Sequence, residues 1–205
     1  MTTTQVSRPT SLYTVLPTDQ DWPAQGYWTY DDFLRLPADG NRYEIINGAL
    51  YMVNAPDPEH QYAVHQIAVE FELYVRNNPA GVVFAAPIEV HLSDIARPVQ
   101  PDVLYISEAR RSIVKTKFIE GAPDIIVEVT SPSTMRIDRK IKFDAYERAG
   151  VREYWIVNPK THSIEVYAPV NGEYDLYGEF GPGETVTSPV LTGFSMLTDI
   201  AFNRA

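Results

Sequence analysis

The sequence predicts an α/β fold, in which a mixed β-sheet is flanked by helices. The β-branched residues Ile125, Ile126, Val127 and Val129 are typical of a strand that is covered on both faces. Apolar residues recur at helical spacing from Glu59 to Asn77, which predicts a helix of about five turns with one apolar face. The order of helix, strands, long helix, strands, helix and strands favours a mixed sheet over a regular βαβ repeat.

The first elements follow from capping and turn residues. Thr29 and Asp32 have the form of a capping box, and they open a short helix that a proline ends. An Asn-Gly pair at 47–48 separates the apolar runs 43–46 and 50–53. This pattern predicts a hairpin with a two-residue turn.

Strands dominate the rest of the chain. The segment 107–121 is basic and predicts a partly irregular connection. A charged helix follows the strand at 125–129 and ends at Gly150, where glycine suits a left-handed C-cap. A second Asn-Gly pair at 171–172 predicts another hairpin. The remaining strands are expected at 82–84, 88–92, 103–106, 154–157, 164–167 and 174–177.

Composition indicates one soluble globular domain. The chain has 205 residues, of which 44% are hydrophobic and 21% charged. Residues 1–25 are polar and lack periodicity, so they predict a flexible N-terminal extension before a single domain at 26–205. The absence of cysteine excludes disulfide frameworks, thiolate zinc sites and cysteine nucleophiles. There is neither the apolar region of a signal peptide nor an apolar run of about 18 residues, so we expect a cytoplasmic protein without membrane partners.

The charge distribution bears on nucleic-acid binding. The formal net charge of −10 counts against it, because phosphate binding depends largely on Lys and Arg. The segment from Arg97 to Arg152, however, contains 11 of the 17 basic residues and 8 of the 27 acidic ones, so it carries a net charge of +3 and the remainder −13. A local basic surface is one interpretation, and charges that only solvate loops and a helix face are the other.

Glu128 lies within the buried strand, where an ionised carboxylate is costly unless a cation or donors accompany it. The following helix offers such a group, because Asp138, Lys142 and Tyr146 recur every four residues and share one stripe. Asp124 lies four residues upstream on the same strand, roughly 13 Å away, and is too distant to share an ion with Glu128.

Asp102 is the better partner for Glu128, because it opens a different strand that could pair alongside. Two carboxylates on adjacent strands form half of a site for a hard cation, and Mg²⁺ or Mn²⁺ is the expected cofactor. Zinc is excluded by the absence of cysteine and by the spacing of the four histidines, of which His60 and His65 point in different directions on one helix. His60 is expected to cap or pack at the helix start.

Several motifs appear in an order that points to a known family. They are Tyr43-Glu44-Ile45-Ile46-Asn47-Gly48, His60 at the start of the long helix, Gln100-Pro101-Asp102-Val103, 122–129, 131–134, Asp138 with Lys142 and Tyr146, and 150–155. Asp102, Glu128 and a lysine resemble the PD-(D/E)XK nuclease superfamily, and the whole set resembles the Uma-type restriction endonuclease family. The resemblance implies a restriction-endonuclease-like core, Mg²⁺-dependent hydrolysis of DNA and often a homodimer.

One position departs from the superfamily pattern. Two residues after Glu128 stands Thr130, where the pattern has its lysine. Lys142 on the next helix is expected to take that role, and Lys140 is its competitor, about 200° around the helix. Alternatively, Asp138 and Lys142 form only a surface ion pair worth about 0.2–0.5 kcal/mol.

Glu44 is the fourth candidate residue. On a strand it shares a face with Ile46, and the resemblance implies an inward carboxylate that serves as a further metal ligand or a base. A solvent-facing glutamate is the alternative.

The sequence therefore predicts a Mg²⁺-dependent DNA endonuclease. Asp102 and Glu128 would hold the metal, and Lys142 would orient water and offset charge on the phosphate.

Two other functions stay open. One is a nuclease fold that acts as a binding or assembly module without catalysis, which the missing triplet lysine and the net charge favour. The other is a metal-dependent hydrolase of a small phosphorylated substrate, for which acidity is no handicap.

Overall fold

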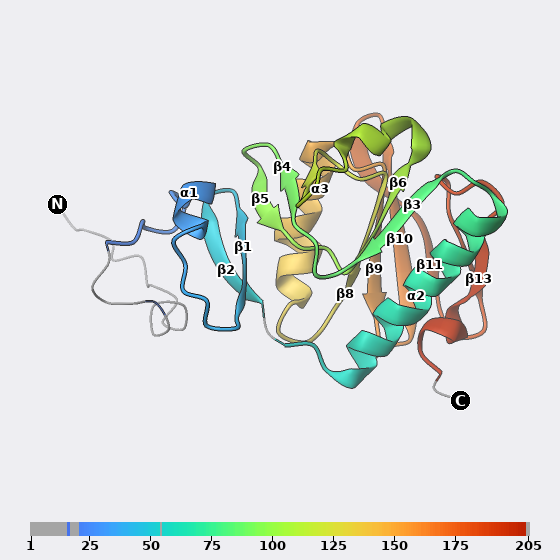
Figure 1. The fold of residues 1–205 in the computed structure, drawn as a ribbon. Coiled ribbons are helices and arrows are strands. Elements are labelled where there is room, and N and C mark those ends of the chain that lie inside the picture. Colours follow the sequence, from blue (N-terminus) through green and yellow to red (C-terminus); the bar gives the residue numbers. More distant parts are fainter. Residues whose placement is uncertain (1–15, 17–20, 54, 204–205) are drawn as a thin grey trace.

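The computed structural model describes residue 16, residues 21–53 and residues 55–203. In that part of the chain the strands form a six-stranded sheet, a five-stranded sheet and a two-stranded ladder. Figure 1 shows the two larger sheets with α3 (Phe143–Ala149) between them, whereas α2 (Pro58–Asn77) lies on the opposite side of the six-stranded sheet.

The six-stranded sheet has the order β11-β10-β9-β8-β6-β3. Its central strand β8 is parallel to β9 and antiparallel to β6. Every residue of β8 is buried, as expected for a strand that is covered on both faces. The strands are β3 (Gly81–Ala85), β6 (Val103–Ser107), β8 (Ile125–Val129), β9 (Glu153–Asn158), β10 (Ser163–Val170) and β11 (Glu173–Phe180).

The five-stranded sheet has the order β2-β1-β5-β4-β7. Its hairpin turns at Asn47 and Gly48, whose φ angles of 50° and 69° are those of a two-residue type I′ turn. A Cβ at Gly48 would lie 2.4 Å from the carbonyl oxygen of Gly26, so only glycine fits there. The strands are β1 (Arg42–Ile46), β2 (Ala49–Val53), β4 (Val90–Leu92), β5 (Ala96–Val99) and β7 (Ile119–Glu120).

The smaller elements include a helix that changes type along its length. A π-helix, η2 (Ile137–Lys142), runs directly into α3, and Gly150 closes that helix with a φ of 80°. The crossover from β8 to the parallel strand β9 thus contains both helical segments. The other small elements are α1 (Tyr30–Phe33), the 3₁₀ helices η1 (Glu108–Ile113) and η3 (Thr198–Ala201), and the ladder of β12 (Thr185–Thr187) with β13 (Ser195–Leu197).

Two apolar cores lie on the two faces of β8. Val127 packs with Phe71 of α2 on one face, and Ile126 packs with Tyr146 of α3 on the other. Side chains alternate along a strand, so Glu128 must emerge on the same face as Ile126. The carboxylate therefore points toward α3 and the five-stranded sheet.

Most predicted elements are present, including the capping box of Thr29 and Asp32 and the long helix. The short helix ends at Phe33, before the proline that was expected to end it. Strands β5 and β7 were not predicted. Strand β5 contains a proline, which normally argues against a strand. Strand β7 has only two residues, too few to show a pattern.

The predicted extension at 1–25 lies largely outside the described residues. In its described part, Leu16 packs in a small core with Trp28. The amide of Gln25 exchanges two hydrogen bonds with the backbone of Leu50, at 2.7 and 3.1 Å. The boundary at residue 26 stays a prediction.

Candidate active site

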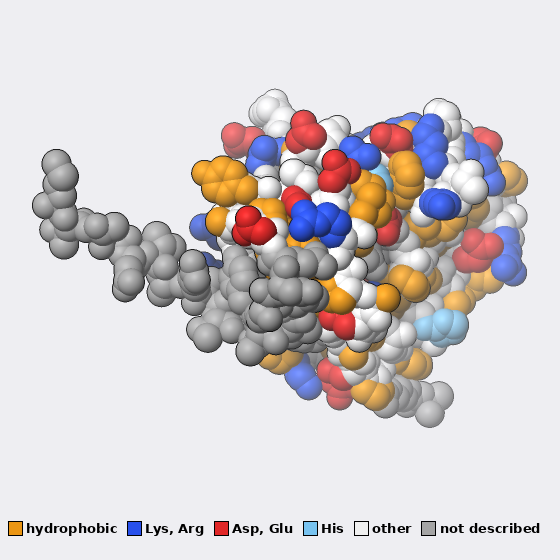
Figure 2. All heavy atoms as spheres, turned by 60° about the vertical axis from the view of Figure 1, so that its left-hand side comes forward, with side chains coloured by type: hydrophobic (Ala, Val, Ile, Leu, Met, Phe, Trp, Pro, Cys, Tyr) orange, Lys and Arg blue, Asp and Glu red, His pale blue; other side chains and the backbone are white. Residues whose placement is uncertain are grey.

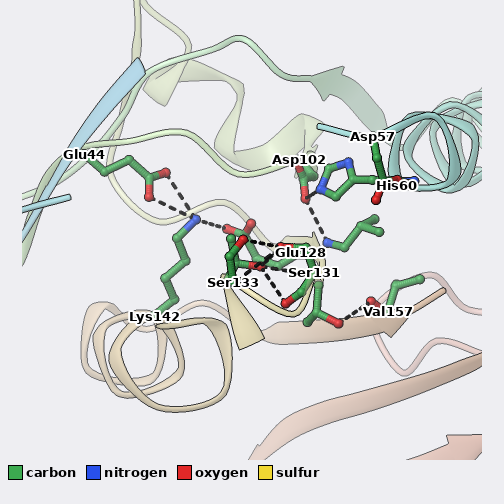
Figure 3. A network of polar contacts seen from close by, with 12 residues as sticks. Glu44, Asp57, His60, Asp102, Glu128, Ser131, Ser133, Lys142 and Val157 are labelled. Carbon is green, nitrogen blue, oxygen red and sulfur yellow. Dashed lines mark hydrogen bonds and ion pairs between the residues drawn. The ribbon is translucent and has the colours of Figure 1, made fainter. Parts of the chain in front are cut away.

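A cavity of about 370 Å³ opens between the β1–β2 hairpin, the start of α2 and the start of η2. Polar groups from five separate segments of the chain line it, and Figure 3 shows several of them pointing toward one another. The lining side chains that can carry charge are Arg42, Asp57, His60, Asp102, Glu128, Asp138 and Lys142.

Lys142 lies at the centre of a buried network. Its ammonium Nζ is 3.0 Å from Oε1 of Glu128 and 3.1 Å from Oε2 of Glu44. The hydroxyl of Tyr146 donates to the same Glu128 oxygen at 2.6 Å. All four side chains are buried. The helical stripe thus supplies Glu128 with both a cation and a neutral donor.

Glu44 faces inward, toward Lys142. One of its oxygens also accepts a 2.7 Å hydrogen bond from the backbone N–H of Gln100. These contacts hold the carboxylate on the hairpin side of the network (Figure 3). The alternative of a solvent-facing glutamate is wrong, because Glu44 is only 2% exposed.

Asp102 lies beside Glu128 because of the strand register. Val103 of β6 pairs with Val127 of β8 in antiparallel register, so Asp102, just before β6, lies opposite Glu128 of β8. Oδ2 of Asp102 accepts a 2.8 Å hydrogen bond from the backbone N–H of Val129. The same oxygen lies 3.2 Å from Nε2 of His60.

His60 is the site residue that the sequence interpretation undervalued. Asp57 caps α2 and accepts from the backbone N–H of His60 at 2.8 Å, so the His60 ring is free to reach Asp102. Its Nδ1 is buried without a hydrogen-bond partner. Burial opposes protonation of the ring, but the hydrogen bond and the charge of Asp102 outweigh it and raise the pKa of His60. The signal in the sequence was the place of His60 among the motifs that resemble the Uma-type family.

The cavity holds more carboxylates than cations. Burial raises the pKa of Glu128 well above its usual range; Lys142 opposes this, and the charges of Asp102, Asp138 and Glu44 add to it. Burial likewise raises the pKa of Asp138 to about 6. Lys142 stays protonated, because the neighbouring carboxylates outweigh its burial and raise its pKa. Four carboxylates thus compete for one ammonium, an arrangement that a bound cation would relieve.

The competing residues lie elsewhere. Lys140 is exposed, so Lys142 is the lysine of this helix that enters the cavity. The alternative of a surface ion pair between Asp138 and Lys142 is wrong, because both side chains are buried. The hydroxyl of Thr130 donates to the carbonyl of Val157 at 3.2 Å. Asp124 pairs with two arginines outside the cavity, at 3.1 and 3.2 Å.

The donor set fits a hard divalent cation. Among residues 16, 21–53 and 55–203, no three His, Cys, Asp or Glu side chains converge as metal ligands. Magnesium is often held by only one or two carboxylates and keeps several waters. The adjacent carboxylates of Asp102 and Glu128 match that requirement, and the carboxylate excess around them favours a positive charge.

Some basic residues of 97–152 are paired with carboxylates. Arg110 and Arg152 pair with Asp124, and Arg139 pairs with Glu165. On the face seen in Figure 2, acidic and basic side chains are interspersed. No helix in the described part of the chain is long and apolar enough to cross a membrane.

Comparisons with known proteins agree with this fold. Residues 30–201 match the model of the Uma2 family, whose description is "Putative restriction endonuclease". The crystal structure of a putative nuclease belonging to DUF820 from Anabaena variabilis ATCC 29413 superimposes with a TM-score of 0.71 and 19% identity, over 85% of this chain and 97% of that one. At this identity the likeness concerns the fold, and it confirms the predicted restriction-endonuclease-like core. No curated protein matches the chain significantly. Because the family model spans most of its length, the chain belongs to the Uma2 family.

Proposed function

We propose that the protein is a Mg²⁺-dependent or Mn²⁺-dependent endonuclease that hydrolyses phosphodiester bonds of DNA. The observation that carries the proposal is one cavity lined by two carboxylates, Asp102 just before β6 and Glu128 on β8, with the ammonium of Lys142 3.0 Å from Glu128. Membership of the Uma2 family supports the nuclease reaction.

Each residue has a distinct role in this proposal. Asp102 and Glu128 would hold the metal, with water and substrate oxygens as further ligands. When bound, the divalent cation supplies Lewis-acid polarisation of the phosphate and activation of water. Lys142 offsets negative charge that develops on the phosphate in the transition state.

Two further residues position these groups. Glu44 holds the Lys142 ammonium on the side away from Glu128, at 3.1 Å. His60 shares Oδ2 of Asp102 with the backbone N–H of Val129, which leaves the other carboxylate oxygen for the metal. Metal ligands in proteins are commonly oriented by such hydrogen-bonded neighbours. Lys142 thus takes the place of the triplet lysine that is absent at Thr130.

The family resemblance extends the proposal to a homodimer, and we also propose that the protein acts in the cytoplasm. Sedimentation of the purified chain tests the dimer. Fractionation of cells that express it tests the location.

The deciding experiment is cleavage of supercoiled plasmid DNA by the purified full chain in Mg²⁺. We expect nicked and linear products with wild type, none after addition of EDTA, and none with Asp102→Ala. Asp144→Ala removes an exposed carboxylate from α3 and is the matched control, with wild-type activity expected. Circular dichroism confirms that the variants fold.

Two outcomes would contradict the proposal. Cleavage by Asp102→Ala at the wild-type rate would refute the assigned metal site. Hydrolysis of bis(p-nitrophenyl) phosphate by wild type without any cleavage of DNA would instead favour a hydrolase of small phosphorylated substrates.

A further inference from the structure

One arginine side chain of the cavity has no partner among the described residues. Arg42 lines the cavity and is half-buried, yet within residues 16, 21–53 and 55–203 its guanidinium makes neither a hydrogen bond nor an ion pair. The nearby carboxylates are engaged by other groups. Glu44 and Glu128 accept from Lys142, and Asp102 accepts from the Val129 backbone and His60.

The strand places Arg42 on the same side as the network. Arg42 precedes Glu44 by two residues on β1, and alternation puts both side chains on one face. Across the hairpin, Arg42 pairs with Val53 and Glu44 pairs with Tyr51. Arg42 therefore lies on the hairpin wall of the cavity, beyond Glu44.

A second unpaired arginine lies at the rim of the cavity. Arg136 stands between Thr134 and Asp138, which both line the cavity. Its side chain is exposed, and within the described part of the chain it forms no ion pair. Its charge also lowers the pKa of Tyr51, although burial, the larger effect, raises that pKa.

The charges that line the cavity give these arginines a function. Four carboxylates line it, those of Asp57, Asp102, Glu128 and Asp138, so a phosphate that enters needs cations to offset them. The guanidinium of Arg42 supplies a positive charge at the cavity wall, and its planar fork matches two oxygens of a phosphate.

We propose that Arg42 binds a backbone phosphate of the DNA substrate at the hairpin wall of the cavity, with Arg136 as a second contact at the rim. This inference rests on the proposed endonuclease function. It identifies a substrate-binding residue that makes no metal contact. It also explains how a chain with a net charge of −10 can bind DNA at a site rich in carboxylates.

The experiment measures binding without catalysis. Full-length protein is titrated into a fluorescein-labelled DNA duplex in Ca²⁺ at a series of KCl concentrations, with fluorescence anisotropy as the readout. We expect Arg42→Ala to weaken binding about 10- to 150-fold, since a hydrogen bond to a charged group is worth about 1.5–3 kcal/mol. The slope of log K against log[KCl] should become shallower by about 0.9, the value for one phosphate contact.

Two further variants make the result specific. Arg42→Lys should retain the wild-type slope with intermediate affinity, because it keeps the charge but loses the fork. Lys117→Ala removes an exposed positive charge that does not line the cavity, and should leave affinity and slope unchanged. Thermal melting of Arg42→Ala and Arg42→Lys confirms that any loss of binding is not a loss of folding.

Each outcome has a definite meaning. A folded Arg42→Ala with the wild-type slope and affinity overturns the role of Arg42 and leaves the endonuclease proposal standing. Equal losses in Arg42→Ala and Lys117→Ala also overturn it, because they indicate a general charge effect. If wild type fails to bind DNA, both the inference and the proposed function are wrong.

Discussion

Replacement of Lys142 by methionine tests the central contact of the site. Methionine keeps the length of the buried stem but removes the ammonium that lies 3.0 Å from Glu128 and 3.1 Å from Glu44. Loss of one partner of a buried ion pair costs about 3–5 kcal/mol, because the other charge stays buried and unpaired. We therefore expect the free energy of unfolding at neutral pH to fall by about that amount.

The loss should depend on pH in a defined direction. Burial already raises the pKa of Glu128 above its usual 4.5, and removal of Lys142 raises it further. In the variant the folded state therefore binds protons that the unfolded state has released, and stability falls as pH rises above 4.5. The difference from wild type should be larger at about pH 8 than at about pH 5.

Urea denaturation in EDTA, followed by tryptophan fluorescence, measures these values. Lys140→Met is the matched control, because Lys140 is exposed on the same helical segment and should change stability by less than about 0.5 kcal/mol. A fall of less than about 1 kcal/mol for Lys142→Met would show that the ammonium does not compensate buried carboxylates, and the reasoning would fail. Equal effects of the two substitutions would refute the choice of Lys142 over Lys140.

The remaining predictions concern the groups around this contact. His60→Ala should weaken Mn²⁺ binding about 10–100-fold in calorimetric titration, since His60 orients Asp102. His60→Gln should recover part of this loss, and replacement of the exposed His65 by alanine should leave the affinity unchanged. Unchanged affinity in His60→Ala would contradict the proposal that His60 orients Asp102. Asp138 has its pKa raised from 3.8 to about 6, so ionisation disfavours the folded state, and this group should lower stability in EDTA by about 3 kcal/mol at most as pH rises between these values. Asp138→Asn should remove this contribution and leave that of Glu128, and an unchanged pH dependence would show that Asp138 does not titrate in this range.

Local patterns predicted most of the fold. The turn at 47–48 requires a positive φ angle at both residues, and few residue pairs other than Asn-Gly adopt them easily. The hairpin could therefore be predicted from the sequence alone. The strand at 125–129 was predictable because four of its five residues are β-branched and apolar on both faces, which is typical of a strand covered on both sides. Strands β5 and β7 could not be predicted from the sequence, because they form strands through their pairing with β4 and not through a local preference.

The candidate site was predictable where a repeat or a register determined it. The four-residue spacing brought Asp138, Lys142 and Tyr146 to one side of their helix, and the pairing of β6 with β8 brought Asp102 to Glu128. His60 was not assigned there because its contact with Asp102 depends on the angle at which α2 meets the sheet. The residues next to His60 and Asp102 in the sequence do not determine that angle.

The π-helical segment η2 makes the site sensitive to the number of residues in the chain as well as to their identity. Each residue of an α-helix turns the chain by about 100°. Deletion of the exposed Lys140 would therefore rotate the C-terminal part of the helix, and if the preceding turn kept its place, Phe143 would occupy the position of Lys142. Every side chain of the site would still be present in the sequence, but the cavity would lose its cation. During divergence of related sequences, single-residue gaps in this stretch should thus be tolerated less than substitutions at its exposed positions.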